Sequence, residues 1–129
     1  MRKTILIMLL AVVSSSAAAD WVYLGGNDTI TFYADPTTIR KAGNVVKLWN
    51  LFDLKTAQLV NGKRYMSTKG QTEYDCKEER TRELYASFHS GNMARGEIVE
   101  LASNMASSWT PVAPRSISED LWKFACGKW

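Results

Sequence analysis

The alternation of hydrophobic and polar positions predicts a series of short strands followed by one C-terminal helix. Runs rich in β-branched and aromatic residues are separated by glycine, asparagine or proline, as in an antiparallel sheet. Beyond residue 116 the apolar positions recur at helical spacing instead. The pattern predicts an α+β fold, with a single domain built from an antiparallel β-sheet of about six strands and a C-terminal α-helix. The predicted strands are residues 21–25, 29–35, 44–52, 64–76, 80–89 and 96–101.

The third predicted strand, residues 44–52, is apolar on both faces. Its even and odd positions each carry large apolar side chains, so both sides of the strand must be covered. Such a strand belongs in the middle of a sheet. The two sets are Val46, Leu48 and Phe52 on one face, and Val45, Trp49 and Leu51 on the other.

Turn and bulge signals predict where the strands are interrupted. Residues 35–44 begin with Asp-Pro and end with Gly-Asn, which is typical of a turn. Asn61-Gly62 predicts a second turn, and Gly70 indicates a β-bulge inside a strand. Alternation along residues 80–89 predicts two faces: Arg82, Leu84, Ala86 and Phe88 on one, and Glu83, Tyr85, Ser87 and His89 on the other.

The C-terminal segment carries the start and stop signals of a helix. Ser116 and Glu119 have the spacing of a capping box, and Gly127 is a typical helix stop. A helix of about ten residues is only marginally stable alone. Residues 117–126 are therefore expected to dock their apolar side on the sheet.

The first 19 residues predict a cleaved signal peptide. A basic start precedes an apolar run of about ten residues, and small residues then occupy the A-x-A positions that signal peptidase recognises. A transmembrane helix needs about 20 apolar residues, so this run is too short to anchor the chain. We expect cleavage between Ala19 and Asp20, which leaves residues 20–129 as one exported domain.

The positions of the cysteines and the net charge argue against two classes of protein, lipoproteins and nucleic-acid-binding proteins. The chain has two cysteines, at positions 76 and 126, so no thiol near the cleavage site is available for lipid attachment and a lipoprotein is not expected. Without Arg2 and Lys3, the 16 basic residues become 14 against 13 acidic ones, a net charge of +1. The basic residues of the 73–82 segment are interleaved with acidic ones, which argues against nucleic acid as a partner.

We expect a disulfide between Cys76 and Cys126. Exported proteins meet an oxidising environment, in which an even number of cysteines favours pairing. A zinc site needs several close ligands, and this chain has one histidine and no CxxC motif. A catalytic cysteine needs a histidine base, for which His89 is the one candidate. The expected disulfide would tie the C-terminal helix to the sheet.

Candidate catalytic residues are few. His89 has no partnered serine or cysteine motif, and we expect it on the surface at a strand end. The GNMARG segment, Gly91–Gly96, lacks the spacing of a phosphate loop and predicts a hairpin turn. Most of the five tryptophans are expected in the core or against the helix. We expect no enzyme activity, no cofactor and no metal.

Six segments follow one another in the order FYADPTTI, VVKLWNLFD, YMSTKG, EYDCKEERTR, SGNMARGEIV and SSWTPVAPRSISEDLWKFAC. Together they resemble the surface-adhesin protein E family of Gram-negative bacteria, over nearly the whole predicted mature chain. The resemblance implies a small antiparallel sheet with a C-terminal helix held to it by the Cys76–Cys126 disulfide. The family includes a surface lipoprotein that adheres to host cells and binds extracellular matrix and plasma proteins. This chain departs from it in lacking a lipid-attachment cysteine.

The sequence thus predicts an exported, non-enzymatic binding protein of the bacterial cell envelope, located in the periplasm or at the cell surface. Its partner is expected to be a protein, and the resemblance suggests a host matrix or plasma protein. Nucleic acid binding and membrane insertion are not expected. Two alternatives remain open: a periplasmic accessory or inhibitor protein, and a small hydrolase.

Overall fold

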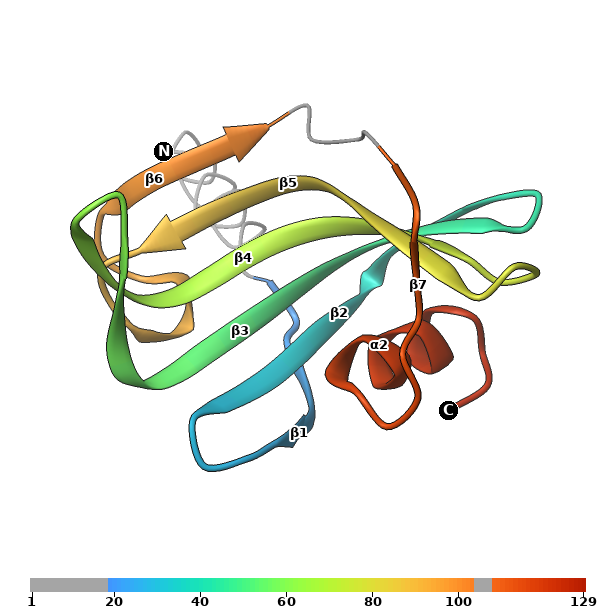
Figure 1. Ribbon diagram of the computed structural model, residues 1–129, viewed down its shortest axis with the longest axis horizontal. Helices are drawn as coiled ribbons and strands as arrows, with labels where there is room; N and C mark the ends of the chain where they lie inside the picture. The colour runs from blue at the N-terminus through green and yellow to red at the C-terminus, as the bar shows by residue number, and fades with distance from the viewer. Residues whose placement is uncertain (1–18, 104–107) are drawn as a thin grey trace, which may run out of the picture.

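Six strands pair in the order in which they occur along the chain, because each is joined to the next by a short connection (Figure 1). The computed structural model describes residues 19–103 and 108–129. All strand pairs are antiparallel, which confirms the predicted α+β class and sheet. The elements are β1 (Val22–Gly26), β2 (Ile30–Ala42), β3 (Val45–Val60), β4 (Lys63–Asp75), β5 (Arg80–His89), the 3₁₀ helix η2 (Asn92–Ala94), β6 (Ile98–Ser103), β7 (Thr110–Pro111), which pairs with β5, and α2 (Ile117–Ala125).

Strand β3 lies in the middle of the sheet, as its two apolar faces predict. β2 and β4 pair with its two edges. Val46 and Leu48 are buried on one face and Leu51 on the other. The strand continues well beyond its predicted end, as far as the turn at Asn61 and Gly62, which both have positive φ. The predicted faces are confirmed, whereas the predicted length is too short.

The predicted turn at residues 35–44 is wrong, because β2 passes through most of it. The strand continues to the β2–β3 hairpin with a register shift between Asp35 and Arg40. Within this irregular stretch, the Thr38 hydroxyl accepts a hydrogen bond from the backbone N–H of Trp49 at 3.0 Å. A side chain thus replaces one rung of the ladder, close to a proline that has no N–H to donate.

The predicted bulge at Gly70 is also wrong. Gly70 pairs regularly with Asn50 and Ala86 on the neighbouring strands. A Cβ at this position would lie 3.1 Å from the carbonyl oxygen of Tyr85 and 3.3 Å from Oδ1 of Asn50. The glycine therefore permits close approach of its neighbours and adds no extra residue to the strand.

The bulge lies instead in β5, at Leu84. Tyr85 and Glu83 pair with consecutive residues of β4, so Leu84 is the additional residue. This shift moves Glu83 to the face that carries Ala86, and moves Arg82 to the opposite face. The predicted alternation of β5 is therefore correct from Tyr85 onward and wrong before it.

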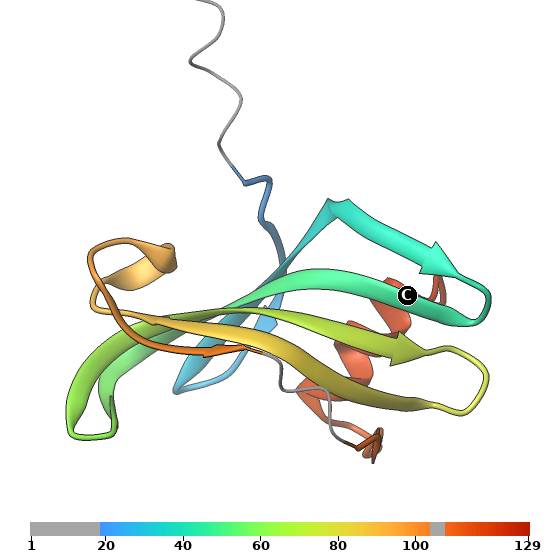
Figure 2. The ribbon, with the colours of Figure 1, turned by 90° about the horizontal axis from the view of Figure 1, so that it is seen from above.

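Helix α2 packs across one face of the sheet, near the end that carries the β2–β3 and β4–β5 turns (Figures 1 and 2). Its predicted cap is present: Ser116 Oγ accepts a hydrogen bond from the N–H of Glu119 at 3.1 Å. The indole N–H of Trp122 donates to the carbonyl oxygen of Asp75 at 2.9 Å. The buried side chains of this interface are Phe32, Ala34, Val46, Leu48 and Tyr74 of the sheet, and Leu121, Trp122 and Ala125 of the helix.

A disulfide joins the residue after β4 to the residue after α2. Cys76 and Cys126 are bonded, with their Cα atoms 5.6 Å apart. The predicted pairing is confirmed. The disulfide ties the C-terminal end of α2 to the end of β4, whereas the Ser116 cap stabilises the first turn of the helix itself.

Candidate functional site

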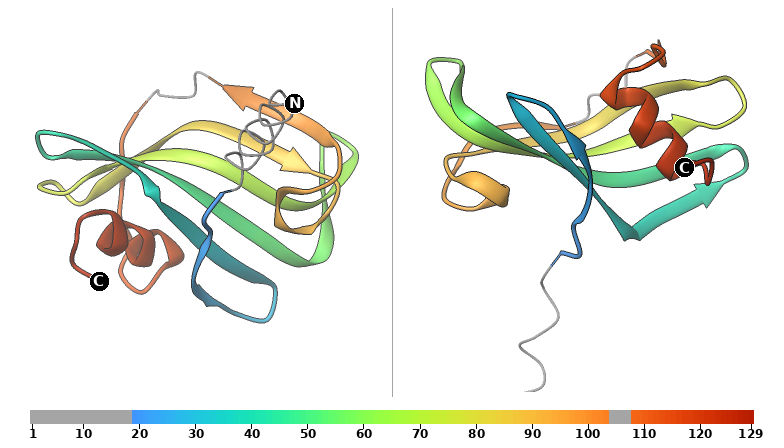
Figure 3. Two further views of the ribbon diagram at one scale, coloured as in Figure 1. Left: turned by 180° about the vertical axis from the view of Figure 1, so that it is seen from behind. Right: turned by 90° about the horizontal axis from the view of Figure 1, so that it is seen from below.

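The sheet face opposite α2 carries a row of side chains, one from each of six neighbouring strands. Figure 3 shows that α2 covers the other face. At the two edges of the sheet, Tyr23 and Leu101 are 61% and 53% exposed. The row runs from β1 to β6 as Tyr23, Tyr33, Leu51, Lys69, Ser87 and Leu101. We call this side of the sheet the open face.

Aromatic side chains form two pairs on the open face. The rings of Trp49 and Tyr85 meet edge to face with centroids 5.3 Å apart, and those of Tyr23 and Tyr33 do so at 5.9 Å. The Nζ atom of Lys69 lies 5.7 Å from the centroid of the Trp49 ring, within the range of a cation–π contact. We call Tyr23, Tyr33, Trp49, Lys69 and Tyr85 the open-face cluster.

The tryptophans are distributed differently from the sequence expectation. Trp122 is buried, Trp129 is 63% exposed, and Trp49 is half-buried on the open face. Most of the five tryptophans were expected in the core or against the helix, but only Trp122 is buried, and no separate expectation was made for Trp49. Its neighbours on that face, Val45 and Leu51, gave no signal that would separate a surface aromatic from a core one.

Charged residues at the β4–β5 turn form ion pairs at one end of the open face. Arg80 Nε lies 2.9 Å from Asp75 Oδ2, and Arg82 Nε lies 2.7 Å from Glu73 Oε1. Both guanidinium groups lie over the ring of Trp109, at 4.8 and 4.4 Å from its centroid. These contacts explain why Cys76, the residue after β4, is surrounded by mixed charges in the sequence.

The buried carboxylate of Asp75 is held by several donors. The largest effect on its pKa comes from the backbone N–H of Glu78, and the contacts of Arg80 and Lys77 add to it. Together these hydrogen bonds lower the pKa of Asp75 although burial opposes them. The carboxylate therefore stabilises the turn that leads into β5.

His89 is buried, with 4% of its surface exposed, so the predicted surface position is wrong. Its Nε2 atom lies 2.8 Å from Ser87 Oγ, and Nδ1 is buried without a partner in the described chain. The Ser87 hydroxyl lies 3.4 Å from the carbonyl oxygen of Lys69, so the tautomer with Nε2–H gives a continuous series of donors. Burial, and secondly the charge of Lys69, lowers the pKa of His89. The neutral ring is a packed group rather than an exposed base.

The GNMARG segment folds back over the open face, which goes beyond the simple hairpin turn predicted for it. The Ser67 hydroxyl donates to the carbonyl oxygen of Gly91 at 2.6 Å and accepts from the N–H of Ala94 at 2.9 Å. Asp53 Oδ1 accepts a hydrogen bond from the side chain of Asn92 at 3.0 Å. The loop therefore covers one end of the open face, beside the open-face cluster.

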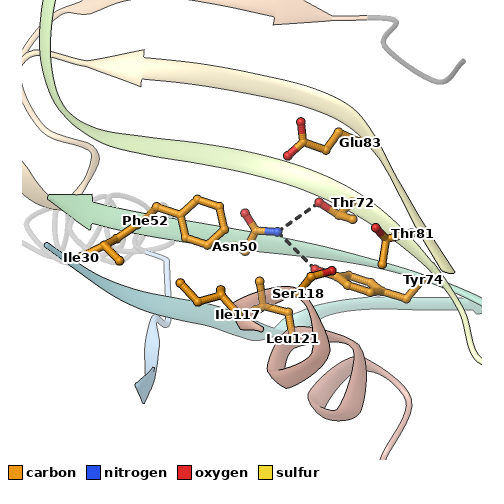
Figure 4. Close-up of a pocket in the computed structure, with 10 residues that line it drawn as sticks. All are labelled: Ile30, Asn50, Phe52, Thr72, Tyr74, Thr81, Glu83, Ile117, Ser118 and Leu121. Atoms are coloured by element: carbon orange, nitrogen blue, oxygen red, sulfur yellow. Dashed lines mark hydrogen bonds between the residues drawn. The ribbon is translucent and has the colours of Figure 1, made fainter. Parts of the chain in front are cut away.

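A pocket of about 220 Å³ lies between α2 and the sheet (Figure 4). At its centre Asn50 Nδ2 donates to Thr72 Oγ1 at 3.1 Å and to the Tyr74 hydroxyl at 3.4 Å. Burial raises the pKa of Tyr74, so its hydroxyl keeps its proton. Glu83 reaches the lining because of the bulge in β5, a position that sequence alternation placed on the wrong face. The central polar side chains bond to one another, as in a satisfied core network.

Three further points concern metal ligands, membrane-spanning helices and the predicted cleavage site. Within residues 19–103 and 108–129, no cluster of histidine, cysteine and acidic side chains could hold a metal ion. The same part of the chain contains no helix long and apolar enough to cross a membrane. Ala19 and Asp20 are the first described residues, and residues 1–18 of the predicted leader lie outside the described chain.

These features define a disulfide-tied α+β domain in which a helix covers one face of an antiparallel sheet and aromatic side chains occupy the other. The family profile described as Surface-adhesin protein E matches residues 21–127. The chain belongs to the Surface-adhesin protein E family, in agreement with the resemblance of its sequence segments.

Solved structures of protein E from Haemophilus influenzae share this fold. Its crystal form II has a TM-score of 0.65 and 13% sequence identity, covering 85% of this chain and 89% of that chain. Protein E from non-typeable Haemophilus influenzae has a TM-score of 0.59 and 12% identity, covering 88% and 79%. At such identities the likeness establishes the fold alone. Among curated protein sequences, none matches this chain.

Proposed function

We propose that this is an exported, non-enzymatic binding protein of the bacterial cell envelope that contacts a protein partner through the open-face cluster. One observation carries the proposal: Tyr23, Tyr33, Trp49, Lys69 and Tyr85 lie together on the face that α2 leaves uncovered. Aromatic residues are enriched at protein interfaces and supply much of their binding energy. Membership of a surface-adhesin family supports a protein as the partner.

The shape of the open face favours a macromolecule over a small substrate. The cluster extends from β1 to β5 across the sheet, so a partner must be wide to reach all of it. Tyrosine and tryptophan offer large, stiff contact areas with a polar group at the edge, which suits a surface that is exposed to water before binding. The buried position of His89 disfavours the alternative of a small hydrolase.

Export rests on the predicted signal peptide and is supported by the disulfide, which is typical of proteins outside the cytosol. A periplasmic accessory or inhibitor protein remains the alternative, because it would share the same leader and the same open face. Cell fractionation combined with protease treatment of intact cells separates the two. Degradation of the protein in intact cells supports a surface location, whereas protection until the outer membrane is opened supports the periplasm.

A photo-crosslinking amino acid at position 23 or 85 tests the binding surface in intact cells. We expect each position to form a discrete protein adduct. Trp129 is the matched control, since it is an aromatic residue of similar exposure to Tyr23, at 63% against 61%, and lies at the C-terminus beside α2. Equal adducts from position 129, or adducts from that position alone, would contradict the proposed surface.

A further inference from the structure

The first described residues of the chain contact a buried carboxylate. Asp35 is 4% exposed and lies where β2 leaves regular pairing. Its Oδ2 atom accepts a hydrogen bond from the backbone N–H of Asp20 at 3.1 Å. Its Oδ1 atom accepts from the N–H of Thr37 at 3.0 Å and from the hydroxyl of Thr37 at 2.6 Å. All three partners are donors, which suits an ionised carboxylate because that group can only accept.

In the described chain no lysine or arginine side chain forms an ion pair with Asp35. The three ion pairs of the described residues all involve other carboxylates. Burial of a carboxylate costs free energy unless hydrogen bonds or an opposite charge compensate for the lost water. Neutral donors supply part of this compensation, and a charged donor in the same place would supply more.

Cleavage between Ala19 and Asp20 would create that charged donor. Hydrolysis of the peptide bond consumes one water molecule and breaks the C–N bond. Ala19 then carries the new carboxyl group, Asp20 carries the new amine, and the proton released by the carboxyl group ends on the amine. Because an unperturbed α-amino group has a pKa of about 7.7 to 8.0, it is an ammonium at neutral pH. The nitrogen that gains the charge is the atom that already lies 3.1 Å from Asp35 Oδ2.

We propose that Asp35 is the binding site for the mature N-terminus, and that removal of the leader converts a neutral hydrogen bond into an ion pair that fixes β1. The inference rests on the export and cleavage of the proposed function. β1 is an edge strand of the described sheet, and its first residue, Val22, pairs with Ala34. The contact from Asp20 to Asp35 lies just beyond this pair. It therefore holds the free end of the edge strand against β2.

This ion pair links processing to the binding surface. Tyr23 belongs to both β1 and the open-face cluster, and its ring contacts Tyr33 on β2. A precursor that keeps its leader has an uncharged amide at Asp20, so β1 is held less firmly there. Cleavage would thus complete the edge of the open face as the protein reaches its compartment.

The α-amino pKa of residues 20–129, prepared with a native Asp20 amine, tests the proposal. This chain contains the whole described sheet, helix and disulfide. An NMR titration should give a pKa at least about one unit above the usual 7.7 to 8.0, a tenfold gain in proton affinity. Asp35→Asn should return the pKa to that range. Thr37→Val removes a donor from Oδ1 without touching the Oδ2 contact, so it should keep the raised value. An ordinary pKa in the unmutated chain, or equal values with Asp35→Asn, would overturn the proposal.

Acetylation of the N-terminus gives a second test that needs no substitution. The acetylated form keeps an N–H donor but loses the charge, so at about pH 6 it should unfold at a lower denaturant concentration than the free amine. A raised amine pKa contributes stability that is present below the unfolded value of about 8 and is lost as the pH rises through the folded value. The denaturation midpoints of the two forms should therefore converge at about pH 11, where the amine is neutral. Equal midpoints at both pH values would overturn the ion pair. Because the N-terminus is set during preparation, this result does not depend on whether cells cleave after Ala19. Cleavage in cells is tested separately, by the intact mass of the native protein.

Discussion

The two faces of the sheet use the same strands in different ways. On the face under α2, Val46 and Leu48 of β3 are 2% and 0% exposed, and a helix packs over them. On the open face of the same strand, Trp49 is half-buried and contacts Tyr85 and Lys69. One face is closed by packing, a helix cap and a disulfide, and the other presents aromatic and charged side chains. The helix-packed core therefore lies on one side of β3 and the proposed binding surface on the other, where Leu51 is also buried.

The polar side chains of the two faces also differ in their hydrogen-bond partners. Under α2, Asn50 bonds to the hydroxyl groups of Thr72 and Tyr74, so the network closes on itself. On the open face, Ser67 and Asp53 bond to the loop that follows β5. The first arrangement satisfies a core, whereas the second attaches a surface loop. Substitutions on the two faces should accordingly have different consequences.

Loss of the disulfide should affect the helix-covered face most. Cys76→Ser, Cys126→Ser and the double variant should each lower the free energy of unfolding by about 4 kcal/mol, because the bond closes a loop of about 50 residues in the unfolded chain. Chemical denaturation measures this change, and reduced wild-type protein should match the variants. A much larger loss for one cysteine than for the other would argue for a second role of that thiol.

A pair of substitutions compares the two faces directly. Leu48→Ala removes a fully buried side chain under α2 and should cost about 3 kcal/mol of unfolding free energy. Tyr23→Ala changes a side chain that is 61% exposed, so the cost should stay within about 0.5 kcal/mol. Denaturant titrations of both variants give the comparison. Equal losses of unfolding free energy would contradict the view that the helix-covered face stabilises the fold and that the open face is free for the proposed binding.

Acid should weaken the covered end of the open face through His89. In the folded protein burial lowers the pKa of this ring, whereas the unfolded value is about 6.5. Between the two values the unfolded chain binds more protons, so this stability is fully present above about pH 6.5 and is lost as the pH falls through the folded pKa. Asp53 and Lys69 are the charged groups on the same face near this ring.

Melting temperatures at about pH 7.5 and about pH 5 measure the effect of His89, since these values bracket its unfolded pKa. The wild-type protein should lose more stability across this interval than His89→Gln, because an amide does not titrate. Asp75, whose pKa is lowered, contributes acid lability below the ordinary carboxyl range of about pH 4, in a separate window. The same pH dependence in both proteins would exclude His89 as its cause.

Regular periodicity predicted most of the fold, and local irregularity accounts for the errors. The spacing of Ser116 and Glu119 predicted the start of α2, and the apolar faces of β3 predicted its place in the sheet. The bulge at Leu84 could not be predicted, because one extra residue in a strand leaves the local composition unchanged. The passage of β2 through Pro36 depends on a side chain from Thr38, which acts only once β3 is in place.

The candidate site was less predictable than the fold. The disulfide followed from the count of cysteines and the predicted export, so Cys76 and Cys126 were identified correctly. The open-face cluster was not, because sequence alone does not show which side of the sheet α2 covers. The burial of His89 was missed for a similar reason, since the strand registers that place Ser67 and Ile98 beside it are long-range features.

The N-terminal cap of α2 offers a smaller test of how the helix holds its face of the sheet. Ser116→Ala should cost about 1 kcal/mol, because the N–H of Glu119 loses its side-chain acceptor at a helix end. Ser118→Ala is the matched control: it lies in the same turn but makes no side-chain hydrogen bond recorded among the described residues, and alanine favours helix, so its cost should be near zero. Denaturation of both variants with the disulfide intact measures the difference. A loss for Ser116→Ala as small as that for Ser118→Ala would mean that the cap contributes little. The stability of α2 would then come from its packing on the sheet and from the disulfide.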